Sequence, residues 1–334
     1  MSESSGSATL LPLSTTELIR RTIQIYANNW RWFLVTAAAI LLPLALLEIG
    51  LGALIGGGVD EALRQGTSDS GGGASVFTLA SPIFLFVMLS FFVQQVFLQG
   101  TISFMTAEAI LGRTATPFTA VEHIRERYLQ LAAALIVVFT IVLTVFVLLT
   151  FAFFLCGLGA GILVYLFVTL FTLLVPVMIL ERVSIGDGIR RTWSLSKRRF
   201  WSLFGLLVVL IILNFLISII FQRADIIVNS VESNSNISYA GVLLNLIYQI
   251  IVSPILPIAI TLMYFDTRIR LEGLGFALES ADLSHVHLSD LPSPKLPARF
   301  TTGDFSNMMV LSLIIMLVLV VLVLVLGVYV SNLV

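Results

Sequence analysis

The chain has 334 residues, of which 58% are hydrophobic and 11% are charged, and its mean hydropathy is +1.05. Soluble domains carry about 25% charged residues, so this composition excludes a water-soluble fold. The net charge of −1 gives no basic field for nucleic acid, and one cysteine with three histidines predicts neither a disulfide nor a zinc site. We therefore expect a membrane protein that binds no nucleic acid and uses no metal or other cofactor.

The apolar residues lie in runs of about 20 or more, the length with which a helix crosses a bilayer. They predict an all-α, polytopic transmembrane helix bundle with seven spans, at 32–55, 77–106, 131–154, 158–180, 202–222, 240–265 and 308–331. The serine-rich start of the chain lacks the basic and apolar segments of a cleaved signal peptide. We expect residues 1–13 to be disordered and the first span to be retained.

Basic residues divide the connections into two sets. The segments 1–31, 107–130, 181–201 and 266–307 hold sixteen of the eighteen lysines and arginines, and Arg64 and Arg223 are the two others. Cytoplasmic connections are enriched in Lys and Arg, so these four segments are predicted to be cytoplasmic. The N-terminus is then cytoplasmic and the C-terminus extracytoplasmic, in the plasma (inner) membrane.

The cytoplasmic segments repeat one another. Ile19-Arg20-Arg21-Thr22 recurs as Ile189-Arg190-Arg191-Thr192, and a weaker copy runs from Thr116 to Tyr128. Each predicts a short amphipathic helix on the inner leaflet, and Thr116 before Pro117 is a typical helix N-cap. We therefore expect three repeated units, each an interfacial helix and a helical hairpin that ends in an acidic residue followed by arginine.

This repeat accounts for six spans and defines the domains. Residues 14–280 form the predicted membrane domain, 281–307 a proline-containing cytoplasmic linker and 308–331 a C-terminal transmembrane helix. The seventh span has almost no polar side chain, which suits a peripheral anchor that faces lipid.

Two cytoplasmic motifs carry a family resemblance. The run Ile179-Leu180-Glu181-Arg182, followed by Gly188-Ile189-Arg190-Arg191-Thr192-Trp193, and the run Tyr264-Phe265-Asp266-Thr267-Arg268-Ile269-Arg270-Leu271-Glu272-Gly273 resemble the membrane domain associated with glycerophosphoryl diester phosphodiesterases. The resemblance covers roughly residues 12–280. In that family the enzyme activity belongs to a separate soluble barrel, so the resemblance implies a membrane module without implying catalysis.

The charges after the sixth span have two interpretations. Asp266 with Arg270, and Arg268 with Glu272, are spaced i,i+4 and can pair on one helix face. Alternatively, guanidinium groups bind phosphate, and the candidate contacts for anionic lipid headgroups are Arg190, Arg191, Arg268 and Arg270.

Polar residues within the predicted spans form a second candidate site. Glu48 is the one charge inside a predicted span, and an intramembrane ionisable group is a functional hypothesis. The Asn and Gln side chains within the spans have two interpretations: they line a polar path, or they form hydrogen bonds between neighbouring helices. The candidate intramembrane polar site comprises Glu48, Gln95, Asn214, Asn245 and Gln249.

The sequence contains no recognisable catalytic constellation, and we expect no enzyme activity. The leading hypothesis is a non-enzymatic module of the plasma membrane that organises lipids, in particular anionic inner-leaflet headgroups, or a membrane protein partner. The alternative is a transporter or channel for a small or lipid-like solute.

Overall fold

The computed structural model describes residues 12–66, 86, 88–156, 159–231, 239–279, 294, 297 and 299–331, and the regular elements in these ranges are helices. Seven of these helices are long and apolar enough to span a membrane, which confirms the predicted all-α, polytopic architecture. They run over Thr15–Leu47, Met88–Ile110, Pro117–Leu149, Gly159–Leu180, Phe200–Arg223, Leu243–Glu272 and Thr302–Val321. The protein is therefore an integral membrane protein.

The helices belong to two compact units, each described separately. Unit 1 comprises residues 1–13, 129–206 and 263–334. It contains most of α5 (Tyr128–Cys156), α6 (Gly159–Phe171), α7 (Leu174–Leu180), α8 (Ile185–Arg198), the start of α9 (Phe200–Val231), the end of α11 (Ile255–Glu272), α12 (Leu274–Glu279) and α13 (Thr302–Ser331). Every residue of α7 is buried, so this short helix forms the centre of unit 1.

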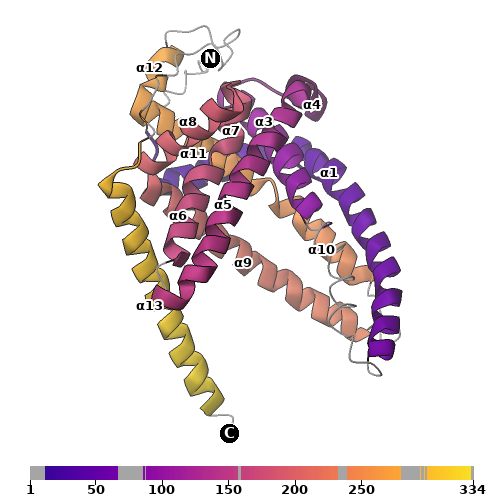
Figure 1. The fold of residues 1–334 in the computed structure, drawn as a ribbon. Helices are drawn as coiled ribbons and strands as arrows, with labels where there is room; N and C mark the ends of the chain where they lie inside the picture. The colour runs from indigo at the N-terminus through magenta and orange to yellow at the C-terminus, as the bar shows by residue number, and fades with distance from the viewer. Residues whose placement is uncertain are drawn as a thin grey trace. The chain divides into compact units, whose positions relative to one another are not determined.

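A close contact fixes α13 against α6, and the two helices lie side by side (Figure 1). A Cβ atom placed on Gly161 would lie 2.4 Å from the backbone nitrogen of Ser312. Only glycine permits this approach of two backbones, as in small-residue contacts between membrane helices. Beyond Ser312, side chains such as Leu317 and Val318 are exposed, as a lipid-facing helix requires. The role of this span as a peripheral anchor stays a prediction.

Unit 2 comprises residues 14–128 and 207–262. It contains α1 (Thr15–Gly66), a helical stretch over 88–93, the π-helical turn η1 (Gln94–Gln99), α3 (Gly100–Ile110), α4 (Pro117–Ile124), the 3₁₀ turn η2 (Arg125–Arg127), the rest of α9, α10 (Tyr239–Val252) and the start of α11. Within this unit, α1 packs against α10, and α3 packs against α4 (Figure 1).

The backbone repeats in the two copies that share Ile-Arg-Arg-Thr. Asn29 interrupts α1 with φ −121° and ψ 18°, and Arg199 separates α8 from α9 with φ −121° and ψ 24°. Asn29 follows Ile19 by ten residues, and Arg199 follows Ile189 by ten. The short predicted helix and the following span are thus joined by the same kink in both copies.

Hydroxyl N-caps begin the three short helices. The side chains of Ser14, Thr116 and Ser184 accept the backbone N–H of the residue three positions later, at 3.2, 3.3 and 3.3 Å. The predicted cap at Thr116 is confirmed, with Pro117 in the first turn. A side-chain oxygen here satisfies a backbone donor that the helix leaves free.

Left-handed residues follow α3, α7 and α11. Among the described residues, positive φ occurs at Gly112 (+76°), Arg182 (+51°) and Gly273 (+67°), after α3, α7 and α11 respectively. Glycine adopts this conformation without strain, whereas a side chain makes it costly, so Arg182 is the strained member of the three.

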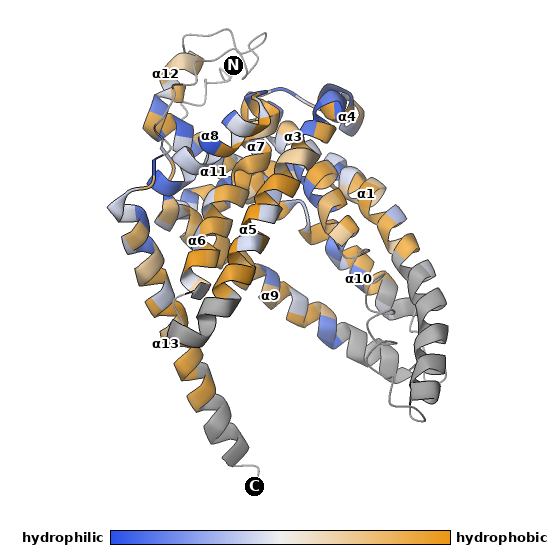
Figure 2. Ribbon diagram, viewed as in Figure 1, coloured by the Kyte–Doolittle hydropathy of each residue, from blue (hydrophilic) through white to orange (hydrophobic). Residues whose placement is uncertain are grey.

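Some boundaries differ from the prediction. The last helix begins at Thr302, six residues before the predicted start at 308, because Asp304 accepts the backbone N–H of Thr301 at 2.7 Å and so stabilises the first turn. Leu13, predicted to be disordered, has an ordered place described below, whereas residues 1–11 and most of the linker 281–307 lie outside the described residues. In unit 1, apolar residues dominate α5 and α6, and hydrophilic residues gather on α8 (Figure 2).

Candidate functional site

A buried group of two carboxylates, two guanidinium groups and one tyrosine joins α8 and α11 to the end of α7. It consists of Glu181, Arg191, Tyr264, Arg268 and Glu272, and we refer to it as the arginine–carboxylate cluster. All five residues belong to unit 1. Two carboxylates face two guanidinium groups, so the formal charge of the cluster is zero.

Arg191 is the link between the two carboxylates. Its Nε donates to Glu181 Oε2 at 2.9 Å, and its Nη2 donates to Glu272 Oε2 at 2.6 Å. A third contact, from Nη1 to the carbonyl of Pro294 at 2.9 Å, reaches the segment that precedes α13. The fixed fork of a guanidinium group suits such simultaneous contacts, which a lysine cannot reproduce.

Arg268 completes the cluster from the side of α11. Its Nε donates to Glu272 Oε2 at 2.8 Å, which confirms the predicted i,i+4 pair. Its Nη1 donates to the Tyr264 hydroxyl at 3.0 Å, and that hydroxyl donates to Glu181 Oε1 at 2.9 Å. The Arg268 side chain is 0% exposed, so protein groups such as these, rather than water, stabilise its charge.

The sequence explains how α8 comes close enough for this contact. A Cβ atom on Gly188 would lie 2.2 Å from the sulfur of Met178 on α7. Glycine at this position therefore lets α8 pack directly on α7. Arg191 follows Gly188 by one helical turn, and this places its guanidinium group beside Glu181, the first residue after α7.

Burial and pairing act in opposite directions on Arg191. Burial lowers the pKa of its guanidinium group, but the hydrogen bonds and charges of Glu272 and Glu181 raise it, and the net pKa lies above the ordinary value. The group is therefore permanently charged. Removing one partner of such a buried pair costs about 3–5 kcal/mol, because the other charge is left without compensation.

A second group of charges holds the N-terminal segment. Asp266 Oδ1 accepts the backbone N–H of Leu13 at 2.7 Å, and Arg270 Nη2 donates to the carbonyl of Leu13 at 2.7 Å. Arg270 Nε also donates to Asp266 Oδ1 at 3.0 Å, which confirms the second predicted i,i+4 pair. We refer to Leu13, Asp266 and Arg270 as the Leu13 clasp.

Arg199, at the kink between α8 and α9, adds a further charge to the clasp. Its Nη2 donates to Asp266 Oδ2 at 3.0 Å. Burial lowers the pKa of Arg199, and Asp266 offsets part of that effect. The buried Asp266 carboxylate thus connects three segments of unit 1 that are far apart in the sequence.

The four candidate headgroup arginines separate into two pairs. Arg191 and Arg268 are buried and bound to carboxylates, so headgroup contact is the wrong interpretation for them; partners from distant parts of the sequence occupy their guanidinium groups. Arg190 is exposed, and the Arg270 side chain is one-third exposed. These two remain candidates for contact with anionic headgroups.

The candidate intramembrane residues lie in unit 2. Asn214 Oδ1 on α9 accepts the Tyr248 hydroxyl on α10 at 2.7 Å, as expected for an amide that bonds a neighbouring helix. Gln249 Nε2 donates to Asn245 Oδ1 at 3.4 Å within α10. Gln95 is half-buried in η1, and the side chain of Glu48 lies outside the described residues.

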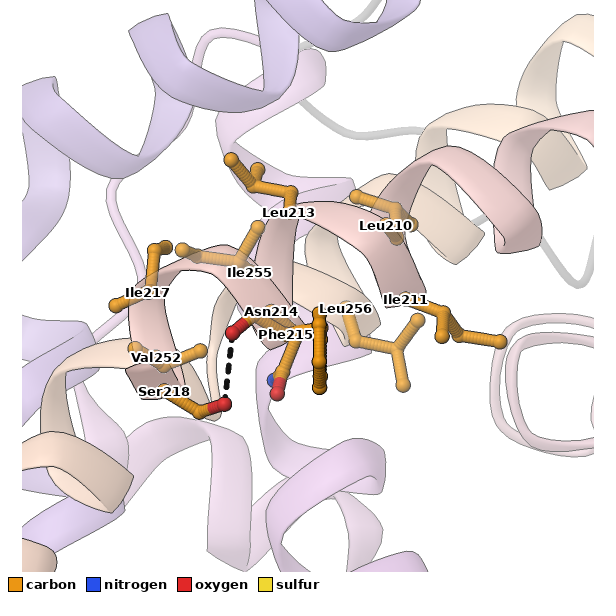
Figure 3. A pocket seen from close by; sticks show the side chains of 10 residues that line it. All are labelled: Leu210, Ile211, Leu213, Asn214, Phe215, Ile217, Ser218, Val252, Ile255 and Leu256. Atoms are coloured by element: carbon orange, nitrogen blue, oxygen red, sulfur yellow. Dashed lines mark hydrogen bonds between the residues drawn. The ribbon is translucent and has the colours of Figure 1, made fainter. Parts of the chain in front are cut away.

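An apolar groove lies beside Asn214 (Figure 3). Its volume is about 300 Å³. It is lined by Leu210, Ile211, Leu213, Asn214, Phe215, Ile217, Ser218, Val252, Ile255 and Leu256. The Ser218 hydroxyl donates to the Phe215 carbonyl at 2.8 Å, so Asn214 is the main polar group of this wall. Such a groove suits a lipid chain better than an ion.

Three features of these sites were not predicted. No partner was predicted for Glu181, whose partners include Arg191 and Tyr264. The clasp on Leu13 and the π-helical turn at Gln94–Gln99 also escaped prediction. The i,i+4 spacing that revealed two pairs contains no information on partners 10 or 81 residues apart.

Comparison of the chain with protein-family models, with curated proteins and with solved structures yields no match. The resemblance described above therefore stays an expectation.

Proposed function

We propose that this integral membrane protein is a non-catalytic module of the plasma membrane that organises anionic lipids, or a membrane protein partner, along its cytoplasmic face. The proposal agrees with what the resemblance to the membrane domain of glycerophosphoryl diester phosphodiesterases implies. The exposed apolar faces of the short helices support it most directly.

These faces point away from the protein interior. Phe118 on α4 is 87% exposed, and Val121 on the next turn is exposed as well. In α1, Ile23 and Trp30 are exposed, whereas Thr22 is buried. Large apolar side chains in such positions lower their free energy by contact with acyl chains, as in helices that lie in the membrane interface.

Charge distribution adds the preference for anionic lipid. The arginine–carboxylate cluster is neutral and closed on itself, whereas Arg20, Arg190 and Arg198 are exposed near apolar residues of the same short helices. Arginines next to a membrane surface favour anionic headgroups by about 1 kcal/mol each. The short helices thus combine an apolar contact with a cationic one.

Thermal unfolding in neutral detergent tests the proposal. Added phosphatidylglycerol is expected to raise the melting temperature by several degrees more than equal amounts of phosphatidylcholine, because a ligand stabilises the state that it binds. Equal shifts with both lipids would contradict the preference for anionic headgroups.

Cysteine labelling tests the proposed orientation. In a variant without Cys156, cysteines introduced within 60–75 or 224–238 are expected to react from outside intact cells. A cysteine in place of Ser293 should react only after permeabilisation. Labelling of that cysteine in intact cells would contradict the proposed orientation.

The transport alternative has one specific observation in its favour. The second span contains a π-helical turn with three glutamines, Gln94, Gln95 and Gln99, and Gln99 is buried. π-Helical turns occur frequently at functional sites in membrane and soluble helices. Solute flux into proteoliposomes that disappears on Gln99→Leu substitution would favour this alternative over the lipid-organising module.

A further inference from the structure

A basic pocket lies in unit 1 between the end of α8 and the start of α13. Its volume is about 490 Å³, within the range of about 300–1,000 Å³ typical of small-molecule sites. It is lined by Lys197, Arg198, Pro297, Arg299, Thr301, Gly303, Asp304 and Asn307. We refer to it as the α8–α13 pocket.

The charges of this pocket do not cancel. Lys197 donates to the carbonyl of Arg299 and lies 3.8 Å from Asp304, so these two opposite charges offset each other. Asp304 is further held by the Tyr165 hydroxyl at 2.5 Å. Arg198 and Arg299 are exposed, and within the described residues neither has an ion-pair partner. The pocket therefore retains two guanidinium groups for an anion.

The pocket lies at the level where two spans begin. One apolar span starts at Phe200, two residues after Arg198, and another starts at Thr302, three residues after Arg299. A site where two apolar spans begin is expected at the depth of the headgroups, because the apolar part of each span matches the hydrocarbon layer. Its ligand is therefore drawn from the membrane interface or from the adjacent aqueous phase.

Aromatic side chains support this depth. Trp201 donates from its indole nitrogen to Asn307 Oδ1 at 3.0 Å, which joins α9 to α13 beside the pocket. The ring of Trp193 stacks on that of Phe300, with centroids 6.5 Å apart. Tryptophan is enriched at membrane–water interfaces, where its ring lies among the headgroups and its N–H is bonded.

We infer that the α8–α13 pocket binds a phosphate group, held by Arg198 and Arg299 and taken from an anionic phospholipid headgroup. Guanidinium groups bind phosphate oxygens in a bidentate manner, which suits the two arginines that line this pocket. The inference rests on the proposed lipid-organising function and assigns it a specific site.

Single and double substitutions of the two arginines test the site in the full-length protein. Arg198→Gln and Arg299→Gln remove charge without removing a described ion pair, so the melting temperature in neutral detergent should stay unchanged. The extra stabilisation by phosphatidylglycerol should fall in each variant and fall further in the double variant, while exposed arginines outside the pocket, such as Arg190, keep the remainder. Arg299→Lys should keep part of it, because it retains charge but loses the bidentate geometry.

Arg125→Gln is the matched control. Arg125 is an exposed arginine in η2, outside the pocket, and its replacement removes the same charge. This variant should respond to phosphatidylglycerol like the parent. If Arg198→Gln and Arg299→Gln also respond like the parent, the pocket is not the site, although the lipid-organising function stands.

A second arm distinguishes the two sources of phosphate. Inorganic phosphate is added in place of lipid, with sodium chloride at equal ionic strength as reference. Stabilisation by phosphatidylglycerol alone supports a headgroup site. Stabilisation by inorganic phosphate that the double variant loses supports the pocket but identifies a soluble ligand and contradicts the lipid proposal. If neither phosphatidylglycerol nor inorganic phosphate stabilises the protein, both the phosphate site in the pocket and the lipid-organising function are overturned.

Discussion

Two copies of one sequence motif differ in the burial and the ion-pair partners of their arginines. Both copies begin with a serine N-cap, carry an acidic residue three positions later and continue with Ile-Arg-Arg-Thr, from Ser14 to Thr22 and from Ser184 to Thr192. In the first copy both arginines pair with Glu17 on the same helix, at 2.7 and 3.3 Å, and remain partly exposed. In the second copy Arg191 is buried in the arginine–carboxylate cluster.

One residue within the motif accounts for much of this difference. The residue before the isoleucine is Leu18 in the first copy and Gly188 in the second. The Leu18 side chain is buried. Gly188 has no side chain, and this leaves room for Met178 and lets α8 approach α7. The packing of the helix therefore decides whether an arginine of this motif stays at the surface or is buried in an ion-pair cluster.

The largest effect is expected from the buried arginine. Arg191→Gln should lower the free energy of unfolding by about 3–5 kcal/mol, because Arg268 is then the one remaining arginine beside two buried carboxylates, Glu181 and Glu272. Arg21→Gln, at the equivalent position of the first copy, should change the melting temperature little, because surface ion pairs contribute little to stability. Thermal unfolding of both variants in the same detergent checks this. Equal destabilisation would mean that burial does not separate the two copies.

A smaller effect is expected at the residue that sets the approach of α8. Gly188→Leu gives the second copy the residue of the first and should cost about 1–3 kcal/mol through overpacking against Met178. Gly186→Leu is the matched control on the same helix, since a Cβ atom there has no neighbour within 4 Å. Unfolding midpoints measure the difference. A fully tolerated Gly188→Leu would refute the packing explanation of the comparison.

The smallest effect should be the same in both copies. Ser14→Ala and Ser184→Ala each remove an N-cap hydrogen bond and should each cost about 1 kcal/mol. Hydrogen exchange of the Glu17 and Asp187 amides, the donors to these caps, reports the local loss directly. A cost confined to one serine would show that the two helices do not begin in equivalent ways.

Local patterns explain what was predictable from the sequence. Runs of apolar residues define the spans, Thr116-Pro117 defines a helix start, and i,i+4 spacing pairs Asp266 with Arg270, because each pattern depends on neighbours in one helix. The arginine–carboxylate cluster and the Leu13 clasp depend on which helices pack together. Hydrophobic periodicity in a membrane helix does not determine its neighbours, because lipid and protein are equally apolar.

The sequence also does not show which candidate site residues are buried, because burial depends on helix packing. Arg190 and Arg191 are adjacent in the sequence and equally basic, yet one is exposed and the other is buried. Only the approach of α8 to α7 distinguishes them. The early start of α13, by contrast, depends on Thr301 and Asp304, a local cap within a segment whose prolines suggested an extended linker.

The Leu13 clasp also has a consequence for biosynthesis. Leu13 and Asp266 are 253 residues apart, so Leu13 leaves the ribosome long before the helix to which it bonds. At about 5–20 residues per second, translation of the intervening chain takes roughly 13–50 s. During this interval the backbone of Leu13 has no intramolecular partner in Asp266 or Arg270. Closure of the clasp thus requires that α11 has been made, and a chain arrested before that point lacks both bonds to the backbone of Leu13.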